Sequence, residues 1–277
     1  MTTATRTLFI GNRSFNPEHW EPFNWDDPLH GNQTYGEVAV IRPEGTSGSL
    51  MSGLWRTGRD IAGCEPDGSV DLKYSAPLGD ETMVILEGSV LITERASGRQ
   101  HQIEAGTILS HPKGVDLRWQ IRSPFLKKMW VLWDSPQTAT KEDHLYVANI
   151  SDNPPNWTPF EWVEPDAGPQ VCGETYIIRG TGSTGSYRCG LWRTGVGVPG
   201  CAPDGSATVR YTAPLGDEMI LLLEGQAHLV NEETGEEHDL KAGDIVGLPS
   251  GLPVTWTSKA PYVKKFFVIT NEALPAS

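Results

Sequence analysis

The sequence contains little cysteine, few basic residues and no long apolar run. Four cysteines among 277 residues are too few for the disulfide framework of a secreted scaffold, so we expect reduced thiols. The 22 Lys and Arg residues are outnumbered by 35 Asp and Glu residues, and no basic cluster is present that could neutralise nucleic-acid phosphates. No segment approaches the roughly 18 apolar residues of a membrane-spanning helix, and residues 1–10 lack the apolar core of a signal peptide. These absences predict a cytoplasmic protein that binds neither nucleic acid nor a membrane.

The composition favours a β fold. With 30 Gly and 21 Pro residues, the chain is rich in turn formers. Short runs of Val, Ile, Leu and aromatic residues, bounded by Gly, Pro or Asp, predict strands at residues 72–76, 82–86, 90–94 and 127–133. No long window shows the apolar period of an amphipathic helix. We therefore predict an all-β protein built as a sandwich or a barrel.

The chain is an internal duplication with a period of 137 residues. The segment Gly-Leu-Trp-Arg-Thr-Gly at 53–58 recurs at 190–195, and Ala-Pro-Leu-Gly-Asp-Glu at 76–81 recurs at 213–218. No insertion or deletion is needed to align the copies. This repeat length is typical of two tandem domains rather than of a solenoid.

We place the domain boundary in the polar segment 135–143, which gives domains at 1–137 and 138–277. The N-terminal arms of the two domains also match each other. We expect these arms to add strands across the domain junction; they carry Trp20, Trp25, Trp157 and Trp162.

Spaced motifs in each copy resemble the two signature motifs of the cupin superfamily. In the first copy, the segment that starts at Tyr74 ends at Glu81 and is followed by Gly88, and Gly106 is followed by Pro112-Lys-Gly. The Pro-x-Gly…Trp…Lys-Lys pattern is most similar to the ureidoglycine-aminohydrolase and ethanolamine-utilisation branch of cupins. The resemblance implies a bicupin, a tandem duplication of a double-stranded β-helix (jelly-roll) barrel. Such a chain imitates a homodimer, so we expect a monomeric pseudo-dimer or a homodimer.

The resemblance also implies metal-ligand positions that this chain fills differently. Most metal-dependent cupins place His-x-His before the motif glutamate and a third His after the Pro-x-Gly glycine. A lone carboxylate is a poor site for a first-row divalent metal, which takes about three or four N, O or S ligands. We therefore expect no metal and no other cofactor in either barrel. The three His positions hold Tyr74, Ala76 and Leu117 in the first copy and Tyr211, Ala213 and Val254 in the second.

Strand alternation identifies four candidate catalytic residues. Because alternate residues of a strand face the same side, Tyr74 and Glu81 should point into the first barrel, and Tyr211 and Glu218 into the second. A carboxylate and a phenol in an apolar, aromatic cavity suit general acid–base chemistry. Alternatively, the glutamates are structural and hydrogen-bonded to the backbone or to the tyrosines. We expect the seven histidines to be surface residues or locally hydrogen-bonded ones.

Six further residues are candidates for binding a small-molecule ligand. Tryptophan offers a flat apolar face. An inward Lys would bind a substrate carboxylate, pair with the glutamate or, if desolvated, act as a nucleophile or base. One lysine of each Lys-Lys pair should point inward, and alternation does not decide which. In each Trp-Arg pair, either the ring or the guanidinium lines the barrel. The candidates are Trp119, Trp256, Lys128, Lys265, Arg56 and Arg193.

These residues predict a metal-independent enzyme that uses acid/base chemistry on a small polar or carbonyl-containing metabolite, as an isomerase, lyase or cyclase. Two alternatives stay open: a bicupin that binds a small molecule without transforming it, and a metal-dependent hydrolase of the ureidoglycine-aminohydrolase type with unusual ligands. Shorter aliphatic side chains in the second copy predict a roomier second cavity, so we expect the C-terminal barrel to be the functional one. The pairs compared are Leu72 and Val209, Met83 and Ile220, and Leu117 and Val254.

Overall fold

The computed structural model describes residues 6–122, 124–136 and 144–271, and every regular element in these ranges is a β-strand. The first copy forms β1 (Phe9–Asn12), β2 (Glu21–Asp27), β3 (Gly31–Arg42), β4 (Ser49–Gly58), β5 (Val70–Tyr74), β6 (Asp80–Glu87), β7 (Ser89–Glu94), β8 (Gln100–Glu104), β9 (Thr107–His111), β10 (Leu117–Ile121) and β11 (Phe125–Asp134). Each recurs 137 residues later, as β12 (Tyr146–Asn149), β13 (Thr158–Glu164), β14 (Gly168–Arg179), β15 (Ser186–Gly195), β16 (Ala207–Tyr211), β17 (Asp217–Glu224), β18 (Gln226–Asn231), β19 (Glu237–Lys241), β20 (Asp244–Leu248), β21 (Val254–Ser258) and β22 (Tyr262–Asn271). The predicted all-β duplication is confirmed.

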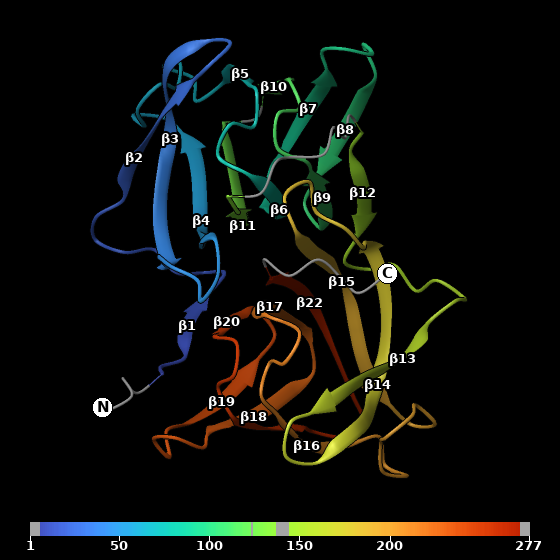
Figure 1. The fold of residues 1–277 in the computed structure, drawn as a ribbon. Coiled ribbons are helices and arrows are strands. Elements are labelled where there is room, and N and C mark those ends of the chain that lie inside the picture. Colours follow the sequence, from blue (N-terminus) through green and yellow to red (C-terminus); the bar gives the residue numbers. More distant parts are fainter. Residues whose placement is uncertain (1–5, 123, 137–143, 272–277) are drawn as a thin grey trace.

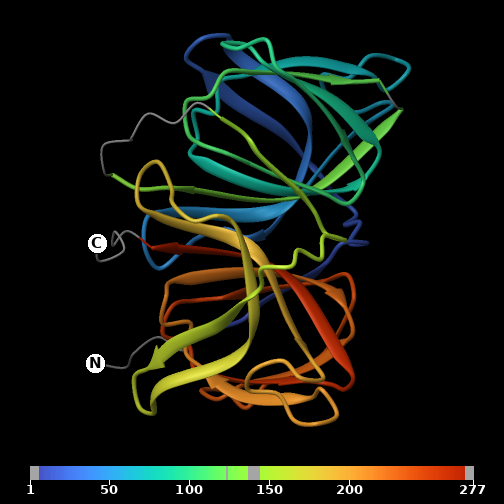
Figure 2. The same cartoon turned by 90° about the vertical axis from the view of Figure 1, so that its right-hand side faces the viewer.

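The strands form two barrels, which lie one above the other in Figures 1 and 2. Each barrel combines one seven-stranded and one four-stranded antiparallel sheet. In the N-terminal barrel the orders are β12-β9-β6-β11-β4-β3-β2 and β5-β10-β7-β8. The C-terminal barrel repeats them as β1-β20-β17-β22-β15-β14-β13 and β16-β21-β18-β19. This is the expected tandem pair of jelly-roll barrels.

The two copies exchange their first strands. β1 pairs with β20 of the C-terminal barrel, with Phe9 opposite Gly247, and β12 pairs with β9 of the N-terminal barrel. Arms therefore cross the domain junction, but the part that carries Trp25 does not, because β2 pairs with β3 of its own copy. The domain boundary predicted at residue 137 lies outside the described residues.

The central strands of the large sheets are buried on both faces. The strand β6, for example, is buried at six consecutive residues from Asp80 to Ile85. Alternate residues such as Met83 and Ile85 face the interior of their own barrel, whereas Val84 belongs to a third apolar cluster shared with Met219 of the other copy. The outer faces of the two large sheets thus pack against each other, so that the barrels share one apolar interface.

Candidate functional site

The N-terminal barrel encloses an apolar cavity of about 80 Å³. Aromatic and aliphatic side chains of the small and large sheets form almost all of its wall, and two charged side chains reach into it. The lining residues are Phe23, Trp25, Val38, Met51, Trp55, Leu72, Tyr74, Leu78, Glu81, Trp119, Lys128, Trp130 and Leu132.

The two charged residues form a buried ion pair. Glu81 lies on β6 and Lys128 on the neighbouring strand β11, and the Lys128 Nζ donates to Glu81 Oε1 at 2.7 Å. Lys128 pairs across the sheet with Trp55, so both face the cavity. The Lys128 ammonium also lies 5.3 Å from the centre of the Trp55 ring and 4.9 Å from that of Trp119. Aromatic faces stabilise this cation where water is largely excluded.

The structure resolves which member of each Lys-Lys pair points inward. Lys128 faces the cavity, whereas Lys127 faces the opposite side and donates to the Phe15 carbonyl at 3.2 Å. In the second copy, Lys265 donates to Glu218 Oε1 at 2.9 Å, and Lys264 donates to the Asp152 carbonyl. Of the alternatives that the sequence left open, the inward lysine pairs with the motif glutamate.

The cation keeps the buried carboxylate ionised. Burial alone would raise the pKa of the Glu81 carboxyl, but the Lys128 ammonium and His111 outweigh burial and lower that pKa from 4.5 to about 2. Burial and the charge of Glu81 raise the pKa of the Tyr74 phenol well above its ordinary value. The Tyr74 hydroxyl therefore stays neutral, and it donates to Glu81 Oε2 at 3.5 Å.

His111 lies beside this site and is not a surface residue, although its Nδ1 makes the expected kind of local contact, to the Pro112 carbonyl at 3.4 Å. It is fully buried, and antiparallel pairing of β6 with β9 places it directly opposite Glu81. Its Nε2 lies 3.4 Å from Glu81 Oε2, and its ring meets the Tyr74 ring edge-on at a centroid distance of 5.8 Å. The N-terminal site thus combines a carboxylate, an ammonium, an imidazole and a phenol.

The C-terminal barrel repeats the ion pair without the imidazole, since Leu248 lies opposite Glu218. The Lys265 ammonium lies 4.9 Å from the ring centre of Trp192 and 5.0 Å from that of Trp256. Burial and the charge of Glu218 raise the pKa of the Tyr211 phenol well above its ordinary value.

The C-terminal cavity is the smaller one, at about 30 Å³, so the prediction of a roomier second barrel was wrong. The prediction compared aliphatic residues, whereas the wall of the second cavity contains aromatic rings that pack against one another. The rings of Trp192 and Trp256 meet edge-to-face with their centroids 6.4 Å apart, and the ring centroids of Phe160 and Tyr211 are 6.3 Å apart. Of the three aliphatic pairs compared, only Leu72 and its counterpart line the cavities.

Arg56 and Arg193 lie outside the cavities, which corrects their assignment as ligand-binding candidates. Because Trp55 and Trp192 take the inward positions, the arginines that follow them face the opposite side. Arg56 pairs with Glu37 at 3.0 Å, and its guanidinium covers the Trp20 ring at 4.3 Å. Arg193 makes the equivalent contacts in the second copy.

The residues of the cavity do not fit a divalent metal. In the described ranges, no group of three or more His, Cys, Asp or Glu side chains is arranged so that it could hold a metal ion. Ala76, at one of the positions that the family resemblance marks for histidine, lies beyond the end of β5 in the left-handed backbone region. The Lys128 ammonium already forms an ion pair with the Glu81 carboxylate, and its positive charge would repel a metal cation at this carboxylate.

Comparison with protein families matches residues 66–130 and 184–267, together more than half of the chain, to the EutQ-like cupin domain. No curated protein sequence matches the chain. In the described ranges, no helix is long and apolar enough to span a membrane. The expected oligomeric state and cytoplasmic location stay predictions.

Three solved structures with the same fold cover most of the chain. A protein of unknown function from Pseudomonas syringae pv. tomato is 18% identical with a TM-score of 0.64, over 96% of this chain and 100% of that one. A putative glyoxylate-induced protein from Pseudomonas aeruginosa is 12% identical with a TM-score of 0.60, over 99% and 93%. A variant of Bacillus subtilis oxalate decarboxylase is 14% identical with a TM-score of 0.51, over 99% and 80%. At these identities the likeness is one of fold.

Proposed function

Because the chain belongs to the family of EutQ-like cupin domains, we propose that its N-terminal barrel is the active site of an enzyme that performs acid/base chemistry, without a metal, on a small polar or carbonyl-containing metabolite. The observation that carries the proposal is the Glu81–Lys128 pair at the wall of the larger cavity, with the His111 imidazole buried behind Glu81. Isomerisation, elimination and ring closure all use such groups. The larger cavity and the imidazole favour this barrel over the C-terminal one.

Lys128 is the group that would bind the substrate. Its ammonium has three donors, of which one is directed to Glu81 and a second to the Met83 Sδ at 3.6 Å, and it lies at the wall of the cavity. A carbonyl or carboxylate oxygen of a ligand would accept from it, while Trp55 and Trp119 pack against the apolar part of the same ligand.

Binding of such an oxygen would turn Glu81 into a stronger base. The low pKa of the Glu81 carboxyl depends on the nearby cation, whereas burial alone acts in the opposite direction. When a substrate oxygen also accepts from the Lys128 ammonium, the ammonium stabilises the Glu81 carboxylate less. The effect of burial then dominates, and the pKa of Glu81 rises. The carboxylate then takes a proton from the carbon next to the carbonyl, and the ammonium stabilises the negative charge that develops on the oxygen.

The proton then returns to the substrate. Glu81 gives it back to a neighbouring atom in an isomerisation, or to a departing hydroxyl in a dehydration, so that atoms and charge balance. His111, 3.4 Å from the carboxylate, is placed to exchange that proton with Glu81. The neutral Tyr74 hydroxyl orients the carboxylate from the other side.

Deuterium exchange tests this proposal without knowledge of the full reaction. Pyruvate, 2-oxobutyrate, acetone and dihydroxyacetone would each be incubated with the protein in D₂O, and loss of the proton signals next to the carbonyl followed by NMR. We expect exchange with at least one probe, and Glu81→Gln to slow it about 100-fold. Glu218→Gln, the matched change in the other barrel, should leave the rate unchanged. Exchange that is equal in both variants, or absent for every probe, contradicts the proposal.

A second candidate function is binding without transformation, and the C-terminal barrel favours it. That barrel keeps the Glu218–Lys265 pair and two tryptophan faces but has Leu248 in place of the imidazole. A site with an anchoring cation and no partner for proton exchange suits a retained ligand. Saturable binding of the probes without deuterium exchange would support this function instead.

A further inference from the structure

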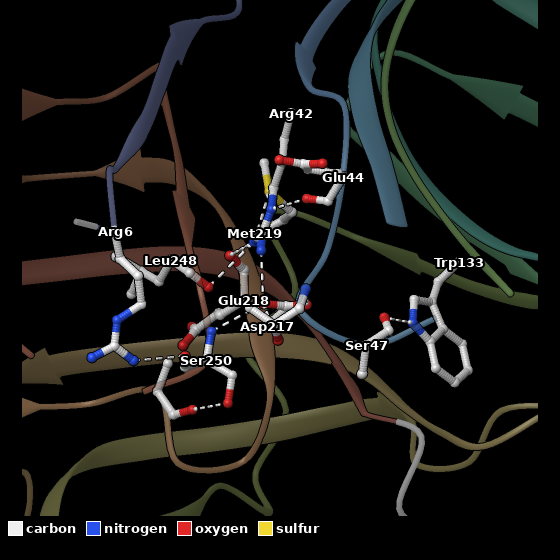
Figure 3. A network of polar contacts seen from close by, with 12 residues as sticks. Arg6, Arg42, Glu44, Ser47, Trp133, Asp217, Glu218, Met219, Leu248 and Ser250 are labelled. Carbon is white, nitrogen blue, oxygen red and sulfur yellow. Dashed lines mark hydrogen bonds and ion pairs between the residues drawn. The ribbon is translucent and has the colours of Figure 1, made fainter. Parts of the chain in front are cut away.

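Each barrel receives a buried arginine from the other. Arg42, the last residue of β3, reaches the C-terminal barrel, where its Nη2 donates to Asp217 Oδ1 at 2.7 Å (Figure 3). Arg179, the last residue of β14, makes the same contact in the opposite direction, to Asp80 Oδ1 at 2.7 Å. All four side chains are at most 1% exposed.

The aspartates stand next to the site. Asp80 immediately precedes Glu81, and Asp217 immediately precedes Glu218. Asp80 also accepts from the backbone N–H of Lys113, in the turn that follows β9, and from that of Ser183 of the other copy. The Asp80 carboxylate therefore links β6, which carries Glu81, to the turn after His111 and to the second domain.

Each arginine also binds the strand that lies opposite the glutamate of its site. Arg179 Nη1 donates to the His111 carbonyl at 3.0 Å, while Nη2 binds Asp80. Arg42 Nη1 donates to the Leu248 carbonyl at 3.2 Å, as Figure 3 shows. The planar fork of arginine thus spans the two neighbouring strands at the cross-strand pair that carries the site residues, a geometry that a lysine ammonium does not reproduce.

We propose that Arg179 is a positioning residue for the N-terminal site, supplied across the domain interface, and that it sets the place of His111 relative to Glu81. The proposal rests on the function proposed above. The site of one barrel is then incomplete without the other half of the chain, although none of the described side chains of that half lines the cavity. Arg42 has the equivalent role for Glu218.

The reporter for this role is the His111 imidazole, observed by NMR of protein labelled with ¹⁵N-histidine and identified by its loss in His111→Leu. We expect Arg179→Met to shift the His111 ring signals. Arg42→Met removes an equally buried ion pair from the same interface but contacts the other barrel, so it should leave those signals in place. If Arg179→Met does not fold, the double variant Arg179→Met/Asp80→Asn removes both charges of the buried pair, and it should shift the His111 ring signals in the same way.

Arg179→Lys separates positioning from simple stabilisation. Lysine retains the charge beside Asp80 but reaches only one acceptor, so thermal stability should recover while the His111 signals stay shifted. In the deuterium-exchange assay, we expect the rate at saturating probe to fall by about 10- to 100-fold in Arg179→Lys, with little change in the half-saturating concentration.

Unchanged His111 signals in the folded Arg179 variants, or equal shifts in Arg42→Met, would overturn the positioning role. The ring signals report this role whether or not any probe exchanges, so failure of the proposed function is recognised separately, by the Glu81→Gln comparison.

Discussion

Replacement of Glu81 by Gln should remove a defined part of the acid sensitivity of the fold. The pKa of Glu81 is about 2 in the folded protein, because Lys128 and His111 outweigh burial, against an ordinary value of 4.5. A carboxyl group whose pKa is lower in the folded state stabilises the fold above its unfolded pKa. That stabilisation is lost as the pH falls from the unfolded towards the folded value.

The magnitude follows from the two pKa values. At about 1.4 kcal/mol per pKa unit, the difference between 4.5 and about 2 corresponds to about 3 kcal/mol of unfolding free energy. Glu81 is 5% exposed, so solvent screens the ion pair little. About 2 kcal/mol of this should be lost by about pH 3, where the unfolded chain has bound its proton and most folded molecules have not.

The assay is urea unfolding followed by tryptophan fluorescence, for the wild type and Glu81→Gln, between about pH 6 and about pH 3. Because Gln does not titrate, subtraction of the two unfolding free energies isolates Glu81 from the other acidic residues. We expect this difference to shrink by about 2 kcal/mol across the range. The same subtraction in the His111→Leu background keeps the contribution of Lys128 to the Glu81 pKa and removes that of His111. A difference that is independent of pH in both backgrounds would refute the reasoning.

Three further predictions follow from the geometry. His111→Leu, which installs the residue found in the other barrel, should slow deuterium exchange about 100-fold and keep the fold, whereas Leu248→His should not slow it; NMR measures both. Deletion of residues through Asn12 removes β1 and exposes the edge of β20, so hydrogen exchange should accelerate at the amides of β20 and not at those of β4. Arg56→Ala should cost at most about 1 kcal/mol in urea unfolding and leave probe binding unchanged, because Arg56 pairs with Glu37 outside the cavity.

The strands and the duplication could be predicted from the sequence because they depend on local pattern. The motif that ends at Glu81 recurs intact at Glu218, and alternation alone places Tyr74 and Glu81 inside the barrel. These features need only the period of a strand and the identity of the residues. The cavity walls around both glutamates were accordingly expected to be apolar and aromatic.

The inward lysine could have been found from alternation within β11 itself. Lys128, Trp130 and Leu132 are two residues apart, and all three line the cavity. Alternation carried forward from the earlier strands did not decide between Lys127 and Lys128, because the loop around Pro124 interrupts the count. The same outcome places Trp55 rather than Arg56 inside, since Trp55 lies opposite Lys128.

His111 could not be placed from its own strand, because its role depends on which residue lies opposite it. The register of β6 with β9 pairs it with Glu81, and no local signal in a single sequence specifies that register. The cavity volumes could not be predicted from the sequence for a similar reason, because the cavity walls include contacts between aromatic rings of different strands, such as Trp192 with Trp256. The Arg179–Asp80 pair joins two domains and has no sequence signature beyond the duplication.

The exchange of first strands has a consequence for synthesis on the ribosome. The N-terminal barrel gains β12 soon after its own copy has emerged, so its large sheet is completed early. Of the described strands, β1 is made first, yet its partner β20 is among the last three. Until β20 emerges, β1 has no partner within its own molecule, and a neighbouring nascent chain that displays β20 offers the same edge. Of the described strands, β1 therefore spends the longest part of synthesis without the strand it pairs with.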